Sequence, residues 1–209
     1  MSWLRLAAHP MQGKITRALN ARLTGTWKRL WNQLVSTGQV PTGVSELVDQ
    51  LADGILQSLL TFNQDIGGVI VQVQASPQDA FHALYTPTQP KPTLTLFVPE
   101  RDQFRYLLTQ SRGQITPIAN SIQECIAHEL VHHDQHAAGQ LDHGTAGLPK
   151  AEYYGDPLEF EPWVNWFLKR LKGRTPKYIE TFVRGYFAQP GMEALADKYV
   201  AEVIRRMGL

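Results

Sequence analysis

Apolar side chains recur at helical spacing in two segments of the first 62 residues. One segment runs from residue 11 to residue 34 and the other from about residue 44 to residue 62. An apolar residue at every third or fourth position places these side chains on one face of an α-helix. The stretch over residues 36–41, which contains Gly38 and Pro41, predicts a linker between two amphipathic helices. Their apolar faces consist of Ile15, Leu19, Leu23, Trp27, Leu30, Trp31 and Leu34 in the first helix and Leu47, Val48, Leu51, Ile55 and Leu59 in the second.

The pattern changes from helical spacing to alternation after two consecutive glycines, Gly67 and Gly68. Over residues 69–74, valine alternates with isoleucine or glutamine, which is typical of a β-strand with two different faces. A second strand is predicted over residues 93–98, between a proline-containing loop and Pro99. The sequence therefore predicts a small sheet that follows the two N-terminal helices.

Helical spacing dominates the second half of the chain. One helix is predicted from Ser121, which has the spacing of a capping box with Glu124, to a stop at Gly139. Asp156 and Pro157 have the properties of an N-cap and of a first helical residue. Strands that precede a run of helices, rather than alternate with them, indicate an α+β fold that is mostly helical. The later helices are predicted over residues 157–173, 175–187 and 191–207.

The helix that begins at Ser121 carries the motif His-Glu-Leu-Val-His at residues 128–132. Histidines four residues apart lie one above the other on a helix, within about 6 Å at their Cβ atoms, so both imidazoles can bind one metal ion. Glu129 lies about 100° round the helix from His128, where a carboxylate can reach a metal-bound water without being a ligand. This is the pattern of a zinc hydrolase with Glu129 as general base. The opposite, apolar stripe of the helix consists of Ile122, Ile126 and Leu130.

A catalytic zinc site needs a third protein ligand, and the neighbouring histidines are badly placed to provide it. His133 points about 100° away from His132, and His136 lies about 12 Å along the helix axis from His128. We therefore expect His133 and His136 to be polar groups on the surface or around the ligands. The other candidates are the two acids in the first turns of the next helix, Glu159 and Glu161.

Glu159 has capping-box spacing to the start of its helix, so the residues alone leave three possibilities open: a capping role for Glu159, or metal binding by Glu159 or by Glu161. A family resemblance bears on this choice. The motif at residues 128–132, Gln135, and the segment Tyr-Tyr-Gly-Asp-Pro-Leu-Glu-Phe-Glu that ends at Glu161 resemble the gluzincin branch of the zincin metallopeptidases, especially small ones of phages and bacteria. The resemblance implies that the third ligand is a glutamate three positions before a small residue. Glu159 fits this description, with Pro162 in the place of the usual alanine.

The resemblance implies a zincin-like fold and a zinc-dependent peptidase with one Zn²⁺ ion per chain. His128, His132 and Glu159 would bind the ion, and Glu129 would take a proton from the water that attacks the peptide carbonyl. Peptides or proteins would be the substrates. An extended substrate would lie along an edge strand, for which residues 93–98 are the candidate.

Peptide hydrolysis passes through a tetrahedral oxyanion that needs a hydrogen-bond donor. Tyr154, or its neighbour Tyr153, lies just before the helix that carries Glu159 and could supply a phenol. Tyrosines are also common in packed cores, so a structural role is the alternative for both. Tyr154 is the candidate catalytic residue beside Glu129.

Charge is distributed unevenly along the chain. The whole chain has a net charge of +1, but residues 1–45 contain six basic residues and no acidic one. The remainder has 14 basic and 19 acidic residues, a net charge of −5. We therefore divide the chain into a basic amphipathic extension over residues 1–40 and a zincin-like metallopeptidase domain over residues 41–209.

The basic helix of the extension has three interpretations. It could pack on the domain or on a second subunit, with its basic side in solvent. It could bind an acidic surface, such as nucleic acid or anionic lipid, through residues 1–35. Its composition also fits a transit peptide, although nothing in it indicates a cleavage site.

The cysteine count and the apolar runs of the sequence bear on the cellular compartment of the protein. Cys125 is the one cysteine, so an intramolecular disulfide is excluded, and we expect a small buried residue there. The chain has neither the apolar segment of a secretory signal near its N-terminus nor an apolar run long enough to span a membrane. We expect a cytoplasmic protein, or a virion-associated one if it is phage-encoded.

Two alternative functions remain open beside the peptidase. The protein could be a catalytically silent structural or assembly protein with a zincin fold, or a peptidase recruited to nucleic acid by its basic helix.

Overall fold

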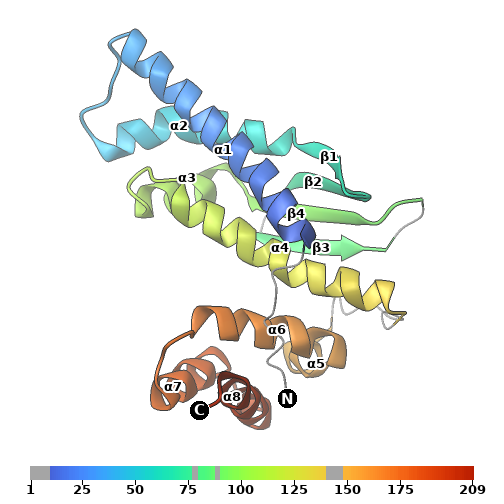
Figure 1. Cartoon of the computed structure of the whole chain (residues 1–209). Coiled ribbons are helices and arrows are strands. Elements are labelled where there is room, and N and C mark those ends of the chain that lie inside the picture. The colour runs from blue at the N-terminus through green and yellow to red at the C-terminus, as the bar shows by residue number, and fades with distance from the viewer. Residues whose placement is uncertain (1–9, 77–79, 88–89, 140–147) are drawn as a thin grey trace. The chain divides into compact units, whose positions relative to one another are not determined.

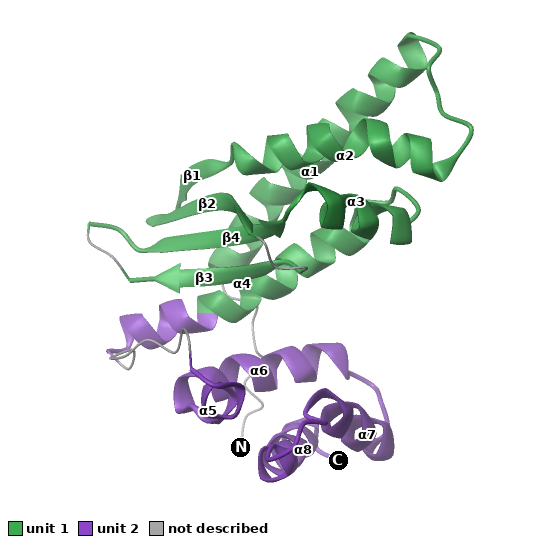
Figure 2. Ribbon diagram, turned by 180° about the vertical axis from the view of Figure 1, so that it is seen from behind, with its two compact units in different colours: residues 1–130 green, residues 131–209 purple. Residues whose placement is uncertain are grey.

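The structure is a computed structural model that describes residues 10–76, 80–87, 90–139 and 148–209. It contains two compact units, Met1–Leu130 and Val131–Leu209 (Figure 2). The boundary falls inside helix α4 (Thr116–Ala137), which therefore contributes residues to both units. The predicted α+β class, mostly helical with a small sheet ahead of the motif helix, is confirmed. Within the described ranges, no helix combines the length and the apolar character needed to cross a membrane.

The first unit begins with two long helices that lead into the sheet (Figure 1). The first half of the predicted apolar face of the first helix is buried: Ile15, Leu19 and Leu23 belong to the same hydrophobic core as the second helix and the sheet. The later members of this face, Trp27, Leu30, Trp31 and Leu34, are half-buried. From Pro10 onward, the basic extension is therefore packed within this unit. The elements are α1 (Pro10–Ser36), α2 (Val44–Leu60), β1 (Asn63–Ile66), β2 (Val69–Ser76), β3 (His82–Thr86), β4 (Thr93–Pro99), α3 (Arg101–Gln110) and the larger part of α4.

The four strands form a mixed sheet in the order β1-β2-β4-β3. β2 and β4 are parallel, whereas β1 pairs with β2, and β3 with β4, in antiparallel fashion. The expectation that residues 93–98 form an edge is wrong, because β4 lies between β2 and β3. Leu94 and Leu96 are fully buried, and Thr95 on the opposite face is buried as well, which suits a strand covered on both sides. The edge on this side of the sheet is β3.

Two strands and two helices are not predicted by the sequence pattern: β1, β3, α3 and α5 (Lys150–Gly155). β1 is polar and largely exposed, and it is held by its pairing with β2 across the turn at Gly67 and Gly68. Both glycines have positive φ angles, and the amide of Gly68 donates a hydrogen bond of 3.0 Å to Asp65 Oδ1. The glycine pair therefore forms the turn of a hairpin.

Helix α4 begins at Thr116, ahead of the start that the capping-box pattern predicts at Ser121. That prediction is wrong, because the Ser121 hydroxyl donates to Pro117 O at 3.2 Å from inside the helix. A serine within a helix can bond the carbonyl four residues before it, so the spacing is not unique to helix starts. The predicted apolar stripe is confirmed, since Ile122, Ile126 and Leu130 are all buried.

The second unit contains the end of α4, the short α5 and three longer helices around an aromatic core. Phe167 and Tyr199 are fully buried, and the Tyr199 ring lies 4.9 Å from that of Phe187. The three helices predicted over this part of the chain are confirmed. They are α6 (Pro157–Arg170), α7 (Pro176–Tyr186) and α8 (Glu193–Met207).

The start of α6 follows the local sequence signals. The Asp156 carboxylate accepts a hydrogen bond of 2.8 Å from the amide of Leu158, and Pro157 is the first helical residue. This start places Glu159 in the first turn of α6.

Candidate metal centre

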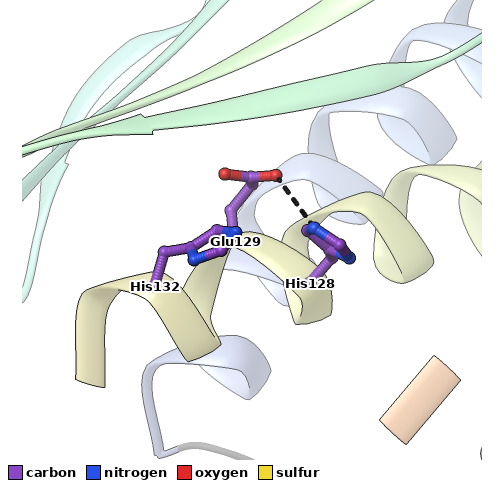
Figure 3. Close-up of side chains that lie close together, drawn as sticks. All are labelled: His128, Glu129 and His132. Carbon is purple, nitrogen blue, oxygen red and sulfur yellow. Dashed lines mark ion pairs between the residues drawn. The ribbon is translucent and has the colours of Figure 1, made fainter. Parts of the chain in front are cut away.

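The motif residues lie together on one side of α4. Ligand-type atoms of His128, Glu129 and His132 are all within 4.8 Å of one another (Figure 3). Glu129 and His132 are 7% and 8% exposed, and His128 is half-buried. The apolar stripe on the other side of the helix faces the core. Because these three donor side chains lie so close together, they could hold a metal ion.

The Glu129 carboxylate is held between a histidine and the edge of the sheet. Its Oε1 lies 3.9 Å from His128 Nε2, and its Oε2 accepts a hydrogen bond of 2.7 Å from the backbone amide of Tyr85 in β3. Figure 3 shows the carboxylate directed away from α4, with the two imidazoles beside it. One carboxylate oxygen is thus fixed by the backbone and the other faces the histidine. The sequence pattern missed Tyr85 because it did not predict β3.

His132 is oriented by Gln135, a buried residue whose role the sequence pattern does not indicate. Gln135 Nε2 donates a hydrogen bond of 2.9 Å to Leu158 O, and Gln135 Oε1 lies 2.8 Å from His132 Nδ1. Since Leu158 O can only accept, the amide oxygen must face the histidine, and Nδ1 must donate to it. In the neutral ring this leaves the lone pair on Nε2, the nitrogen that would bind a metal ion.

Glu159 approaches that nitrogen. Its side chain is 2% exposed, and its Oε1 lies 3.4 Å from His132 Nε2. Two ligand atoms that each lie about 2.0–2.1 Å from a tetrahedral zinc ion are about 3.3–3.4 Å apart. With His132 protonated the two groups form an ion pair, and with the ring neutral and its lone pair on Nε2 they can share a metal cation. The pair therefore has the spacing and the chemistry of two ligands of one ion.

Glu161 is engaged elsewhere. Both of its carboxylate oxygens accept hydrogen bonds of 2.6 Å from the guanidinium of Arg206 in α8. This bidentate pair turns the Glu161 side chain toward α8. Of the two acids that the sequence left open, Glu159 is the one beside a motif histidine.

Among the described residues, the group of possible metal donors consists of the three motif residues and does not include His133 or His136. His133 Nδ1 lies 3.5 Å from Asp134 Oδ1, and both histidines are half-buried on α4. Their positions agree with the directions that a straight helix imposes on neighbouring side chains.

Tyr154 lies in the aromatic core of the second unit. Its ring is 5.0 Å from that of Trp163, and its hydroxyl is 3.4 Å from the hydroxyl of Tyr186. Its backbone carbonyl accepts a hydrogen bond of 2.9 Å from Tyr199. Tyr153 packs edge to face on Tyr154. These contacts show that both tyrosines pack in the aromatic core of the second unit. A role of Tyr154 as oxyanion donor stays a prediction.

Cys125 lies one helical turn before the first motif histidine. Burial, together with the nearby carboxylates of Glu129 and Glu124, raises the pKa of its thiol to about 12. The thiol donates a hydrogen bond of 3.4 Å to Phe81 O. A thiol that keeps its proton at neutral pH is neither a good ligand nor a good nucleophile, which agrees with the structural role expected for it.

Comparison of the chain with protein-family models, with curated proteins and with solved structures finds no match. The resemblance to zincins therefore depends on the motif residues themselves, and what the protein does must be argued from their geometry.

Replacing Gln135 by leucine is expected to weaken zinc binding by about 10- to 100-fold, because residues that orient a ligating histidine typically contribute that much. Leucine keeps the volume but cannot accept from His132 Nδ1, so the ring loses its fixed orientation. Competition with a chromophoric zinc chelator measures the affinity. Gln123→Leu is the matched control, because it makes the same change elsewhere on α4. Unchanged affinity in a folded Gln135→Leu variant would contradict the role assigned to Gln135.

Proposed function

We propose that this protein is a zinc-dependent peptidase of the zincin type. In this proposal His128, His132 and Glu159 bind one Zn²⁺ ion and Glu129 is the general base. The observation that carries it is the distance of 3.4 Å between His132 Nε2 and Glu159 Oε1, at a nitrogen whose lone pair is directed by Gln135. Two imidazoles and one carboxylate are a ligand set of catalytic zinc sites that keep an open position.

A zinc ion bound by this set would polarise a carbonyl group and make water acidic enough to lose a proton near neutral pH. The chain itself supplies the proton acceptor. Glu129 Oε1, which lies on the side of His128, is the oxygen that would take the proton, because Oε2 accepts from the Tyr85 amide. The same hydrogen bond keeps the carboxylate from rotating away and limits how far it must reorganise.

Strand β3 supports a peptide as the substrate. It is an edge strand in the described part of the sheet, and its residue Tyr85 contacts the general base directly. An extended peptide would pair with backbone groups of β3 other than the Tyr85 amide, which already donates to Glu129, and would bring a backbone carbonyl close to Glu129 without any demand on its side chains. This assignment replaces residues 93–98, which lie inside the sheet.

The metal content of the purified protein tests the proposal. We expect about one zinc ion per chain by elemental analysis, and cleavage of a mixed peptide library that a chelator abolishes and added Zn²⁺ restores. Failure to bind zinc from excess metal would refute the metal centre. Zinc binding without cleavage of any peptide would refute the peptidase and favour the silent, structural alternative.

A further inference from the structure

A groove between α1 and α2 is separate from the metal centre. It has a volume of about 610 Å³ and is lined by residues of these two helices, among them Arg22, Thr26 and Arg29 from α1 and Ser58 from α2, and by Thr61, which follows α2. No acidic side chain belongs to its described lining. Its volume is within the range of sites for small molecules, about 300–1,000 Å³.

Two glycines shape the groove. Gly54 on α2 lets Leu30 of α1 come close, since a Cβ atom at residue 54 would lie 2.7 Å from Leu30 Cδ1. Gly25, in the middle of α1, borders open space, because a Cβ atom built there meets no atom within 4 Å. The helices thus touch at Leu30 and leave a hollow beside Gly25.

The charge of the groove comes from two arginines that are held differently. The Arg22 guanidinium is oriented by hydrogen bonds to Ser58 O at 3.0 Å and to Thr61 Oγ1 at 2.7 Å, which leaves its Nη1 group for a further acceptor. Arg29 lies about 10 Å further along α1. Within the described residues Arg29 makes no hydrogen bond or ion pair. One arginine is therefore pre-oriented and the other is available.

The acids of α2 do not neutralise this side of the helix pair. Asp53 forms an ion pair of 2.6 Å with Arg101, and Asp49 forms one with Arg105, both from α3. Neither of these acids lines the groove, and Glu46, the third acid of α2, does not line it either.

The hydroxyls of Thr26 and Ser58 bond each other, and that of Thr61 donates to Ser58 O. The two guanidinium groups, with no acid in the lining, are therefore what attracts an anion with more than one charged oxygen.

We propose that the groove binds a compact ligand that carries at least two phosphate groups, which are bound by Arg22 and Arg29. Arginine binds phosphate through paired N–H groups, and the distance between the two side chains on α1 is short enough for both to reach one polyphosphate. The groove is open to solvent and ends within the stretch from Ala21 to Arg29 on α1, which favours a small ligand over a continuous nucleic acid strand that would follow the basic residues along the whole helix.

Calorimetric titration of the whole protein with inorganic tripolyphosphate tests this proposal at about 0.15 M salt. We expect saturable binding that Arg29→Gln weakens by about tenfold or more, because charge-assisted hydrogen bonds are lost. Gly25→Glu should abolish binding, since it puts a carboxylate into open space of the groove, and it does not break the helix because glutamate favours helix over glycine. Lys28→Gln is the matched control, because it removes one charge from α1 outside the groove.

A second titration, with ATP, distinguishes a nucleotide from a simple polyphosphate as the ligand of the groove. Equal affinities for ATP and tripolyphosphate would assign recognition to the phosphates alone, and tighter ATP binding would place the nucleoside in the rest of the groove; both support the site. No saturable binding to the wild type would overturn it. So would binding of a single-stranded oligonucleotide that Lys14→Gln, Lys28→Gln and Arg29→Gln weaken equally, because the whole basic face of α1 would then be the binding surface.

Discussion

Replacing Glu129 by glutamine is expected to lower kcat/KM for peptide hydrolysis by about 10²–10⁴-fold, the usual contribution of a general base. The zinc content should stay at the wild-type value, because His128, His132 and Glu159 are unchanged. The fold should also be kept, because the glutamine carbonyl can still accept the hydrogen bond from the Tyr85 amide. The measurements are initial rates on a fluorogenic peptide and elemental zinc analysis of the same sample.

Glu46→Gln is the control for this experiment, because it makes the same chemical change at an exposed residue of α2, outside the group of metal-type donors. We expect wild-type activity from it within about twofold, as for a surface change away from the reacting atoms. A Glu129→Gln variant that binds zinc and cleaves peptides at the wild-type rate would exclude Glu129 as the base. Loss of zinc from that variant would instead show that Glu129 is itself a ligand.

The second large effect is expected at Glu159. Glu159→Gln should weaken zinc binding by at least about 100-fold, since a direct ligand contributes more than the residues around it, whose removal costs up to that much. Peptide cleavage should fall with the bound zinc and recover in part at high zinc concentration. Titration against a chelator of known affinity gives the dissociation constant.

Glu161→Gln is a closely matched comparison, because it makes the same change two positions further along α6. It removes the ion pair with Arg206, in which the Glu161 side chain is 38% exposed, so we expect a loss of about 0.2–1 kcal/mol in the free energy of unfolding. Zinc affinity should not change. The opposite result, with zinc lost in Glu161→Gln and retained in Glu159→Gln, would move the third ligand to Glu161.

The sequence by itself determined the features that depend on residues close together in the chain. His128, Glu129 and His132 lie together because one helix imposes their spacing, whatever surrounds it. The start of α6 at Pro157 likewise follows from the Asp156 cap, a contact over two residues. The long helices and the two hydrophobic strands were predictable for the same reason, since their periodicity is local.

Tertiary structure decided the features that depend on distant residues. β3 is short and gains its place by pairing with β4, so neither the strand order nor the contact of Tyr85 with Glu129 was visible in the local pattern. The wrong edge assignment for residues 93–98 has the same origin.

The choice between Glu159 and Glu161 shows the physical reason most clearly. Both acids lie in the first turns of α6, and their local signals are almost equivalent. Packing within the second unit separates them: Arg206, 45 residues beyond Glu161, binds that acid, whereas Glu159 is buried beside His132. Local spacing determines which side chains share a helix face. Only the packed chain determines which partner each of them meets.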